Sequence, residues 1–311
     1  MGRILAAADI GSNTVHLLVA EVEDGLVSRL SDANEWVSLG EVVGRLGKVP
    51  PAVVDRLIKS LDTFRRAAIS MGAEAMYVFG TEALRKAENQ KRVLDAIRVA
   101  TGIQVDLIPG TREAKLGLRG AWLDSDGDGP FLICEVGGGS AQIAHCLVDE
   151  GLPWIDSEVS LPLGTGTLIA KVGIEEPCAA EQYRALEELV TKAIDGVAVG
   201  ENRRMVACGG VIRGLWRALH PDGEREIAVE ELDYLIWATR QLTLDVIVDR
   251  FQVKPKRAAT LLPGAVVYRS LLAAAGLDRL TVSRFGVREG AILELAAGNI
   301  KASRLVSNLK A

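Results

Sequence analysis

One short pattern occurs twice in this chain, as Asp9-Ile10-Gly11-Ser12-Asn13-Thr14 and as Glu135-Val136-Gly137-Gly138-Gly139-Ser140. Each copy has an acid, an aliphatic residue, a glycine, two small residues and a hydroxyl residue. The copies lie 126 positions apart, which is too far for a solenoid repeat and is typical of a duplicated domain. We therefore predict two domains built on one plan.

Each copy lies in the first turn of a predicted strand meander. Apolar runs and alternating residues separated by glycine turns predict three strands in each half, at 4–10, 14–23 and 26–35 and at 131–136, 141–148 and 153–161. After each meander the apolar period becomes helical, for example over residues 54–71 behind Pro50-Pro51. Short strands at 75–79, 105–108 and 204–208 alternate with further helices, including 111–123, so the class is α/β.

A polar run from Asp124 to Pro130 separates the halves, since it cannot continue either neighbour. The expected domains are 1–124 and 125–311, with the last helix allowed to pack back on the first domain. At roughly 150 residues per domain, 311 residues are enough for both.

Composition excludes several classes of protein. Apolar residues make up 49% and charged residues 25%, as in folded globular proteins. The net charge of -5 gives no basic excess, so nucleic acid is not an expected partner. The four cysteines form no C-x-x-C pair and are expected to be reduced structural thiols. No run of about 18 uncharged apolar residues occurs, so we expect a cytoplasmic protein without membrane attachment.

The repeated pattern predicts phosphate binding. An acid at the end of a buried strand is costly without a cation, and a hydrated magnesium ion beside Asp9 and Glu135 would supply one. Small residues leave backbone N–H groups open to an anion, so Gly11, Ser12, Asn13 and Thr14, and Gly137, Gly138, Gly139 and Ser140, are candidate phosphate ligands. Two such hairpins facing each other across a domain cleft would hold a polyphosphate. The alternative for either turn alone is a plain tight hairpin.

Other common catalytic patterns do not occur in the sequence. It has no Walker A motif, Rossmann fingerprint, H-E-x-x-H or G-x-S-x-G, and only three histidines. Residues 124–135 match the EF-hand calcium expression, but the glycines after Glu135 are poor helix formers, so we favour a solvated interdomain turn.

A series of further motifs resembles the exopolyphosphatase and guanosine pentaphosphate phosphohydrolase (Ppx/GppA) family over nearly the whole chain. Besides the two loops, they are Gly80-Thr-Glu-Ala-Leu-Arg85, Gly110-Thr-Arg-Glu113-Ala, Leu161-Pro-Leu-Gly164, Pro263-Gly264-Ala265 and Gly286-Val-Arg288-Glu-Gly290. The resemblance implies two ribonuclease H-like domains of the actin, Hsp70 and sugar-kinase superfold with an interdomain active-site cleft. The chain looks like the family's short two-domain form.

The resemblance also implies the activity, which is magnesium-dependent hydrolysis of the terminal phosphoryl group of inorganic polyphosphate or of guanosine pentaphosphate. Glu113 takes the place of the catalytic glutamate that activates water, and Arg85 that of the phosphate-facing arginine. Asp9 would hold magnesium, and Arg288 is expected to bind phosphate. A homodimer is a possible assembly.

Three departures from the family pattern keep alternatives open. Glu135 replaces the usual Asp of the second loop, Arg112 replaces an acid before Glu113 and would add a cation near the cleft, and Gly209-Gly210 resembles the adenosine-side turn of kinases. The alternatives are a non-catalytic sensor of polyphosphate or guanosine tetra- and pentaphosphate, and an ATP-dependent kinase of the same superfold.

Overall fold

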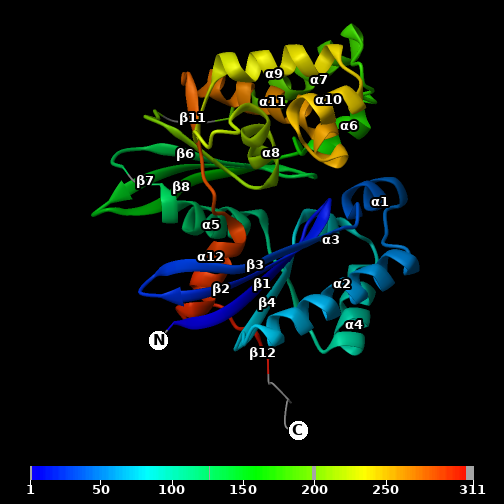
Figure 1. Ribbon diagram of the computed structural model, residues 1–311, viewed down its shortest axis with the longest axis vertical. Coiled ribbons are helices and arrows are strands. Elements are labelled where there is room, and N and C mark those ends of the chain that lie inside the picture. Colours follow the sequence, from blue (N-terminus) through cyan, green and yellow to red (C-terminus); the bar gives the residue numbers. More distant parts are fainter. Residues whose placement is uncertain (1, 126, 198–200, 306–311) are drawn as a thin grey trace. The chain divides into compact units, whose positions relative to one another are not determined.

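The computed structural model describes residues 2–125, 127–197 and 201–305, and the chain divides into two units (Figure 1). Unit 1 comprises residues 1–123 and 286–311, and unit 2 comprises residues 124–285. The expected boundary beside residue 124 agrees with this division, and the last helix packs on the first domain as the prediction allowed, so residues 286–311 belong to unit 1. This helix, α12 (Val287–Ala296), contributes Val287, Ala291 and Ile292 to the core of unit 1.

Unit 1 is built on a six-stranded sheet with the order β12-β4-β1-β2-β3, and β5 also pairs with β4. The first three strands form the predicted antiparallel meander, and β4 runs parallel to β1 and β5. The strands are β1 (Arg3–Ile10), β2 (Thr14–Glu23), β3 (Leu26–Trp36), β4 (Ala75–Gly80), β5 (Val105–Leu107) and β12 (Ser303–Arg304).

Helices cover both faces of this sheet because the strands are apolar on both faces. Ala6, Ala8 and Ile10 pack against one group of helices, whereas Leu5 and Ala7 pack against another. The first group is α1 (Leu39–Leu46), α2 (Pro51–Ser70), α3 (Glu82–Lys86) and α4 (Gln90–Thr101), and the second is α5 (Gly110–Ala121) and α12. A short 3-10 helix, η1 (Trp122–Asp124), follows α5.

Unit 2 repeats the plan on a second six-stranded sheet, with the order β10-β11-β9-β6-β7-β8. Its strands are β6 (Phe131–Val136), β7 (Ala141–Asp149), β8 (Leu152–Leu161), β9 (Met205–Cys208), β10 (Glu226–Ala228) and β11 (Arg279–Val282). Its helices are α6 (Thr165–Val172), α7 (Ala180–Ile194), α8 (Gly210–Leu219), α9 (Val229–Gln241), α10 (Leu244–Phe251) and α11 (Pro255–Ala275).

Helix α11 is the core helix of unit 2. In the described part of the chain it is the one helix long and apolar enough to cross a membrane, but 67% of its most apolar window is buried within the protein. Leu261, Val266 and Tyr268 on this helix are almost completely buried in the cluster that covers the sheet. The apolar composition of α11 is therefore explained by packing.

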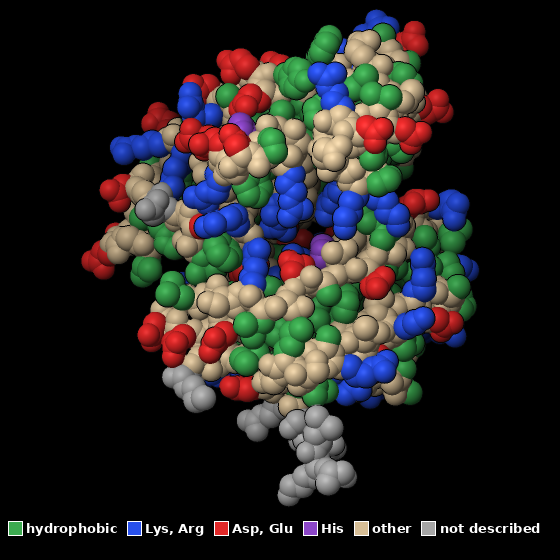
Figure 2. Space-filling view, viewed as in Figure 1, with side chains coloured by type: hydrophobic (Ala, Val, Ile, Leu, Met, Phe, Trp, Pro, Cys, Tyr) green, Lys and Arg blue, Asp and Glu red, His purple; other side chains and the backbone are tan. Residues whose placement is uncertain are grey.

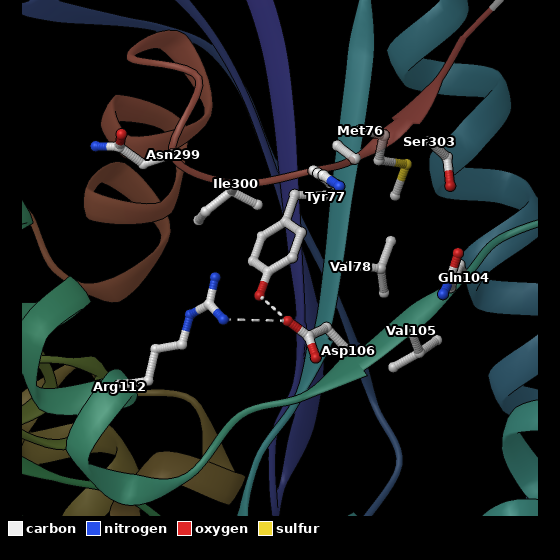
Figure 3. Close-up of a pocket in the computed structure, with 12 residues that line it drawn as sticks. Met76, Tyr77, Val78, Gln104, Val105, Asp106, Arg112, Asn299, Ile300 and Ser303 are labelled. Atoms are coloured by element: carbon white, nitrogen blue, oxygen red, sulfur yellow. Dashed lines mark hydrogen bonds and ion pairs between the residues drawn. The ribbon is translucent and has the colours of Figure 1, made fainter.

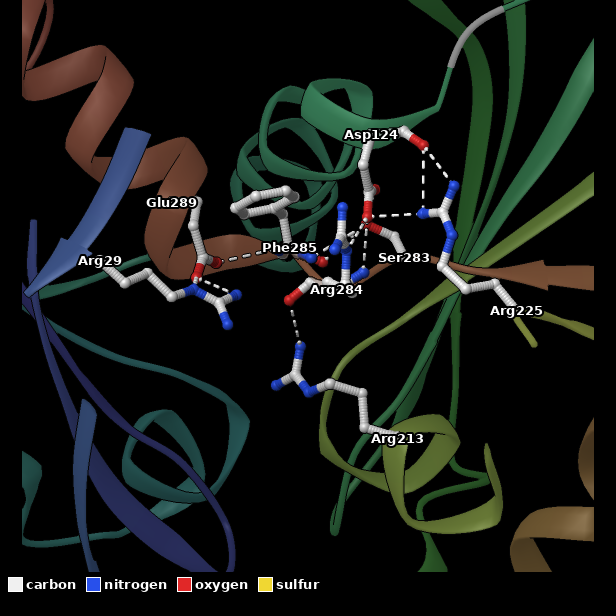
Figure 4. A network of polar contacts seen from close by, with 9 residues as sticks. Arg29, Asp124, Arg213, Arg225, Ser283, Arg284, Phe285 and Glu289 are labelled. Carbon is white, nitrogen blue, oxygen red and sulfur yellow. Dashed lines mark hydrogen bonds and ion pairs between the residues drawn. The ribbon is translucent and has the colours of Figure 1, made fainter. Parts of the chain in front are cut away.

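Asp124 is fixed in unit 2 and is not part of a solvated turn (Figure 4). Its side chain, 5% exposed, accepts hydrogen bonds from Arg225 at 2.7 Å, Ser283 at 2.6 Å and the backbone N–H of Arg284 at 3.0 Å. Asp124 is the first residue of the EF-hand pattern, and its carboxylate oxygens are bonded to these protein groups. Glu135, the last residue of the pattern, lies within β6. Asp126 lies outside the described residues.

Candidate active site

The loop after β1 is closed by one hydrogen bond and braced by the residues that begin α1. The Gly11 N–H donates to the Thr14 carbonyl at 2.9 Å. The carbonyl of Asn13 accepts from the N–H groups of Val37 and Ser38, and that of Ser12 accepts from Gly40 at 2.7 Å. A Cβ atom on Gly40 would lie 2.9 Å from Ser12 Cβ, so glycine permits this approach.

The loop after β6 has the same construction in unit 2. The Gly137 N–H donates to the Ser140 carbonyl at 2.9 Å. The start of α6 then bonds the loop carbonyls, with Thr165 N–H to Gly137 at 3.0 Å and Thr167 N–H to Gly138 at 3.1 Å. A Cβ atom on Gly164 would lie 2.2 Å from the Gly139 backbone, which makes glycine obligatory there.

In both loops the carbonyl groups are used by the protein and two amides are left available. The N–H groups of Gly11 and Gly137, which were predicted to bind phosphate, instead donate within their own loops. Within the described residues, the N–H groups of Ser12, Asn13, Gly138 and Gly139 donate no hydrogen bond to the protein. Backbone amides presented together in a turn form an anion-binding surface. The geometry of each loop therefore supports the predicted role in phosphate binding.

Asp9, the candidate metal ligand at the end of β1, is paired with Arg288 on α12. The Arg288 Nη1 donates to Asp9 Oδ1 at 2.8 Å, and both side chains are nearly buried. Burial opposes the charge of Arg288, but the carboxylates of Asp9 and Glu289 outweigh it and raise the pKa above its usual value. The arginine predicted to bind phosphate thus holds the predicted metal ligand in place and stays charged.

The start of α12 is held by a second, partly buried ion pair in unit 1. Glu289, with a side chain 2% exposed, accepts from Arg29 of β3 at 2.6 Å, as Figure 4 shows. The other Glu289 oxygen accepts from the Gly286 N–H at 2.9 Å and caps the helix. Both oxygens of Glu289 therefore hold the N-terminus of the helix that carries Arg288, one through Arg29 and the other through the Gly286 N–H.

Glu113 and Arg85 form the pair expected to carry the chemistry. Glu113 lies in the first turn of α5 and Arg85 in α3, and Arg85 Nη1 lies 4.0 Å from Glu113 Oε2. The same nitrogen donates to the Ile108 carbonyl, which fixes the guanidinium. The Glu113 side chain is 13% exposed, so it is mostly shielded from bulk water but still accessible.

Helices α5 and α12 approach each other through glycine. A Cβ atom on Gly290 would lie 1.9 Å from the Leu116 carbonyl oxygen, and one on Gly120 would lie 1.9 Å from that of Gly286. This contact fixes the helix that carries Glu113 against the helix that carries Arg288.

Glu135 lies at the corresponding place in unit 2, and its longer side chain is accommodated by a glycine. The Cys208 thiol donates to Glu135 Oε2 at 3.8 Å, and burial followed by the charge of Glu135 raises the pKa of Cys208 well above its usual value. A Cβ atom on Gly209 would lie 2.7 Å from Glu135 Oε1. Glu135 and Gly209 therefore form a matched pair.

Lys and Arg side chains gather around α8 on the face of unit 2 seen in Figure 2. Arg213 on α8 donates to the Arg284 carbonyl at 3.4 Å, and Arg257 donates to the Gly210 carbonyl at 3.2 Å. This local positive charge exists despite the net charge of -5, and it favours an anionic ligand.

Arg112 pairs with a different acid from the one that Arg85 faces. Its Nη1 lies 3.6 Å from Asp106 Oδ2, so its charge is directed to β5. Sequence reasoning missed this partner. It also missed Gly40 and Thr167, which brace the two candidate loops, and it quoted Gly164 in the Leu161-Pro-Leu-Gly164 motif without its role in the second brace.

Comparison with known proteins identifies relatives over almost the entire chain. Residues 18–298 match the Ppx/GppA phosphatase family. Exopolyphosphatase 1 of Mycobacterium tuberculosis is 28% identical over 307 residues, covering 93% of this chain and 87% of that protein. A guanosine-5'-triphosphate,3'-diphosphate pyrophosphatase of Photobacterium profundum is 23% identical, covering 94% of this chain and 59% of that protein.

Solved structures show the same fold. An exopolyphosphatase from Cytophaga hutchinsonii superposes with a TM-score of 0.85 at 20% identity, covering 95% of this chain and 98% of that one. The Aquifex aeolicus family member gives a TM-score of 0.83 at 22% identity, covering 97% and 100%. The predicted fold of the actin, Hsp70 and sugar-kinase type is confirmed.

Proposed function

Because this chain belongs to the Ppx/GppA phosphatase family, we propose that it releases the terminal phosphate of inorganic polyphosphate in a magnesium-dependent reaction. The observation that carries the proposal is the Glu113–Arg85 pair, since it puts a general base beside a cation suited to a phosphoryl group. The relatives named exopolyphosphatase favour polyphosphate, and the relative named for guanosine pentaphosphate makes that compound a second substrate to test.

The two loops supply the phosphate-binding groups of this proposal. Four backbone N–H groups, two in each unit, are available to phosphate oxygens. Such donors recognise charge without reading a base or a sugar, which suits a chain made only of phosphates. The arginines around α8 add positive charge in unit 2.

The carboxylates fit a magnesium ion held mainly by water and by substrate oxygens. Among the described residues no cluster of three or more His, Cys, Asp or Glu side chains could form an all-protein cage. Mg²⁺ in phosphoryl-transfer enzymes usually takes only one or two carboxylates, and Asp9 of unit 1 and Glu135 of unit 2 are each a candidate ligand. When bound, the ion would neutralise charge on the phosphate oxygens.

Three side chains of unit 1 have separate roles in the proposed reaction. Glu113 orients a water molecule and takes its proton, and Arg85 stabilises negative charge on the transferred phosphoryl group. Arg288 is a positioning residue, because it acts on Asp9 through the buried ion pair. Catalysis is then mostly orientation and electrostatics.

The structure offers another explanation for the glycines that suggested the kinase alternative. That alternative rested on the Gly209-Gly210 turn, but the space beside Gly209 is taken by Glu135 and that beside Gly210 by Arg257, whose guanidinium would lie 3.1 Å from a Cβ atom added to Gly210. Both glycines are therefore explained by protein side chains. The sensor alternative remains to be separated by experiment.

The test is Glu113→Gln, which keeps the shape of the side chain and removes the base. We expect phosphate release from polyphosphate to fall by about 10²–10⁴-fold with polyphosphate binding retained. Glu294→Gln is the matched control, because Glu294 also pairs with an arginine of unit 1, Arg119 at 3.6 Å, and should leave turnover unchanged. Tight polyphosphate binding with no release by the unaltered protein would favour the sensor.

A further inference from the structure

Unit 1 contains a pocket of about 550 Å³ at an interruption in the edge of its sheet (Figure 3). Pairing of β4 with β12 reaches Met76, and pairing with β5 begins at Val78. The ladder along this edge is therefore broken at Tyr77, and the two partner strands leave a space beside it. A volume of this size falls within the range of about 300–1,000 Å³ that holds small organic ligands.

The pocket has an apolar part and a polar part. Met76 and Val78, which belong to the core on one face of the sheet, and Ile300, which belongs to the core on the other face, provide almost completely buried apolar side chains at this edge. Figure 3 shows the Tyr77 hydroxyl, Asp106 and Arg112 directed toward one another at the polar part. A ligand that fills the pocket must therefore combine an apolar body with a polar group.

The polar part favours an anion. The Tyr77 hydroxyl donates to Asp106 Oδ2 at 2.8 Å, and burial together with this bond raises the pKa of Tyr77, so it stays a donor. Arg112 lies 3.6 Å from the same oxygen, which is longer than a hydrogen bond, and its side chain is 41% exposed. The five N–H donors of Arg112 therefore make no hydrogen bond to Asp106. Lys301 also lines the pocket, which gives two cations against one carboxylate.

We propose that this pocket binds a small organic anion with an apolar ring or chain. Its anionic group would pair with Arg112 and Lys301, and its apolar body would lie on Met76, Val78 and Ile300. Inorganic phosphate alone would leave the apolar part wet, and a neutral hydrocarbon would make no use of the positive charge of Arg112 and Lys301. The lining of the pocket includes neither Glu113 nor Arg85, and the proposal does not depend on the proposed phosphatase activity.

The test uses anilinonaphthalene sulfonate, an aromatic sulfonate whose fluorescence reports binding. We expect one saturable site per chain, with a Kd raised about tenfold by Lys301→Glu and by Arg112→Gln, since each removes one charge-assisted contact. Arg119→Gln is the matched control, because it removes an exposed cation from the last turn of the same helix. Naphthalene sulfonate should displace the probe, and inorganic sulfate at equal concentration should not.

An unchanged Kd in both Lys301→Glu and Arg112→Gln would overturn the proposal, as would displacement by sulfate alone. Lys301 is exposed, so its variant should fold normally, and equal thermal unfolding midpoints would show this. Because binding is measured without turnover, the outcome is independent of the result for Glu113→Gln.

Discussion

The contact between α5 and α12 predicts that one added methyl group has a large effect. In the variant Gly290→Ala, the new Cβ atom would lie 1.9 Å from the Leu116 carbonyl oxygen and 3.1 Å from the Gly120 nitrogen. Both neighbours are backbone atoms, which cannot rotate away. The two helices would have to separate by about 1 Å to restore an ordinary contact.

The cost of this separation has two parts. Overpacking of a close contact costs about 1–3 kcal/mol or more of folding free energy. In addition, α5 carries Glu113 and α12 carries Arg288, and a displacement of about 1 Å at a reacting group can lower a rate by about 10²-fold. We therefore expect Gly290→Ala to lower the unfolding midpoint and to lower kcat for phosphate release by about 10²-fold.

The assays are thermal unfolding and phosphate release from polyphosphate at saturating magnesium. Gly44→Ala is the matched control, because Gly44 is an exposed position of α1 where an added Cβ atom would meet no neighbour within 4 Å. That change should be neutral or stabilise the protein by up to about 1 kcal/mol. If Gly290→Ala matched the wild type in both stability and kcat, the close helix contact and its role in positioning Glu113 would be refuted.

Two further predictions concern unit 2. Gly209 has a φ of +93°, and a Cβ atom there would collide with Glu135, so Gly209→Ala should lower the free energy of unfolding by roughly 1–3 kcal/mol. Adding Glu135→Asp should recover part of this loss, because the shorter side chain leaves more room. If denaturant unfolding showed the two changes to be additive, the pairing of Gly209 with Glu135 would be contradicted. All four cysteines are free and buried. Burial, followed by the charge of Glu158, raises the pKa of Cys146 to about 12, so a thiolate-selective reagent at pH 8 should modify the cysteines only as fast as the folded protein opens. Rapid modification of the folded chain would argue against this burial.

Local patterns were sufficient to predict the meanders. Alternating residues and glycine turns predicted β2 and β6 with the observed bounds, because antiparallel strands joined by short turns depend on neighbours in sequence. Helix α1 was not predicted. It has only eight residues, two of them glycine, and its start is fixed by hydrogen bonds to the carbonyls of the first phosphate loop.

The candidate residues were predictable individually, but their partners were not. Asp9 and Arg288 are 279 positions apart, and no local pattern indicates that one holds the other. The same applies to Arg29 and Glu289, which are 260 positions apart. Arg112 was expected to add a cation near the cleft because it replaces an acid of the family pattern, but successive helical residues point in different directions, and Arg112 pairs with Asp106.

The division of unit 1 into residues 1–123 and 286–311 has a consequence for biosynthesis. Unit 2 is continuous in sequence, so its core can close while the ribosome is still translating the last segment. The first 123 residues must wait for α12, because Ala291, Ile292 and Leu295 complete one of their two apolar layers. The apolar residues on that face of β1 and β2 are therefore exposed to chaperones and to aggregation until the last part of the chain has been synthesised. Asp9 acquires its ion-pair partner Arg288 in the same final step, so this candidate metal ligand is not held in place earlier.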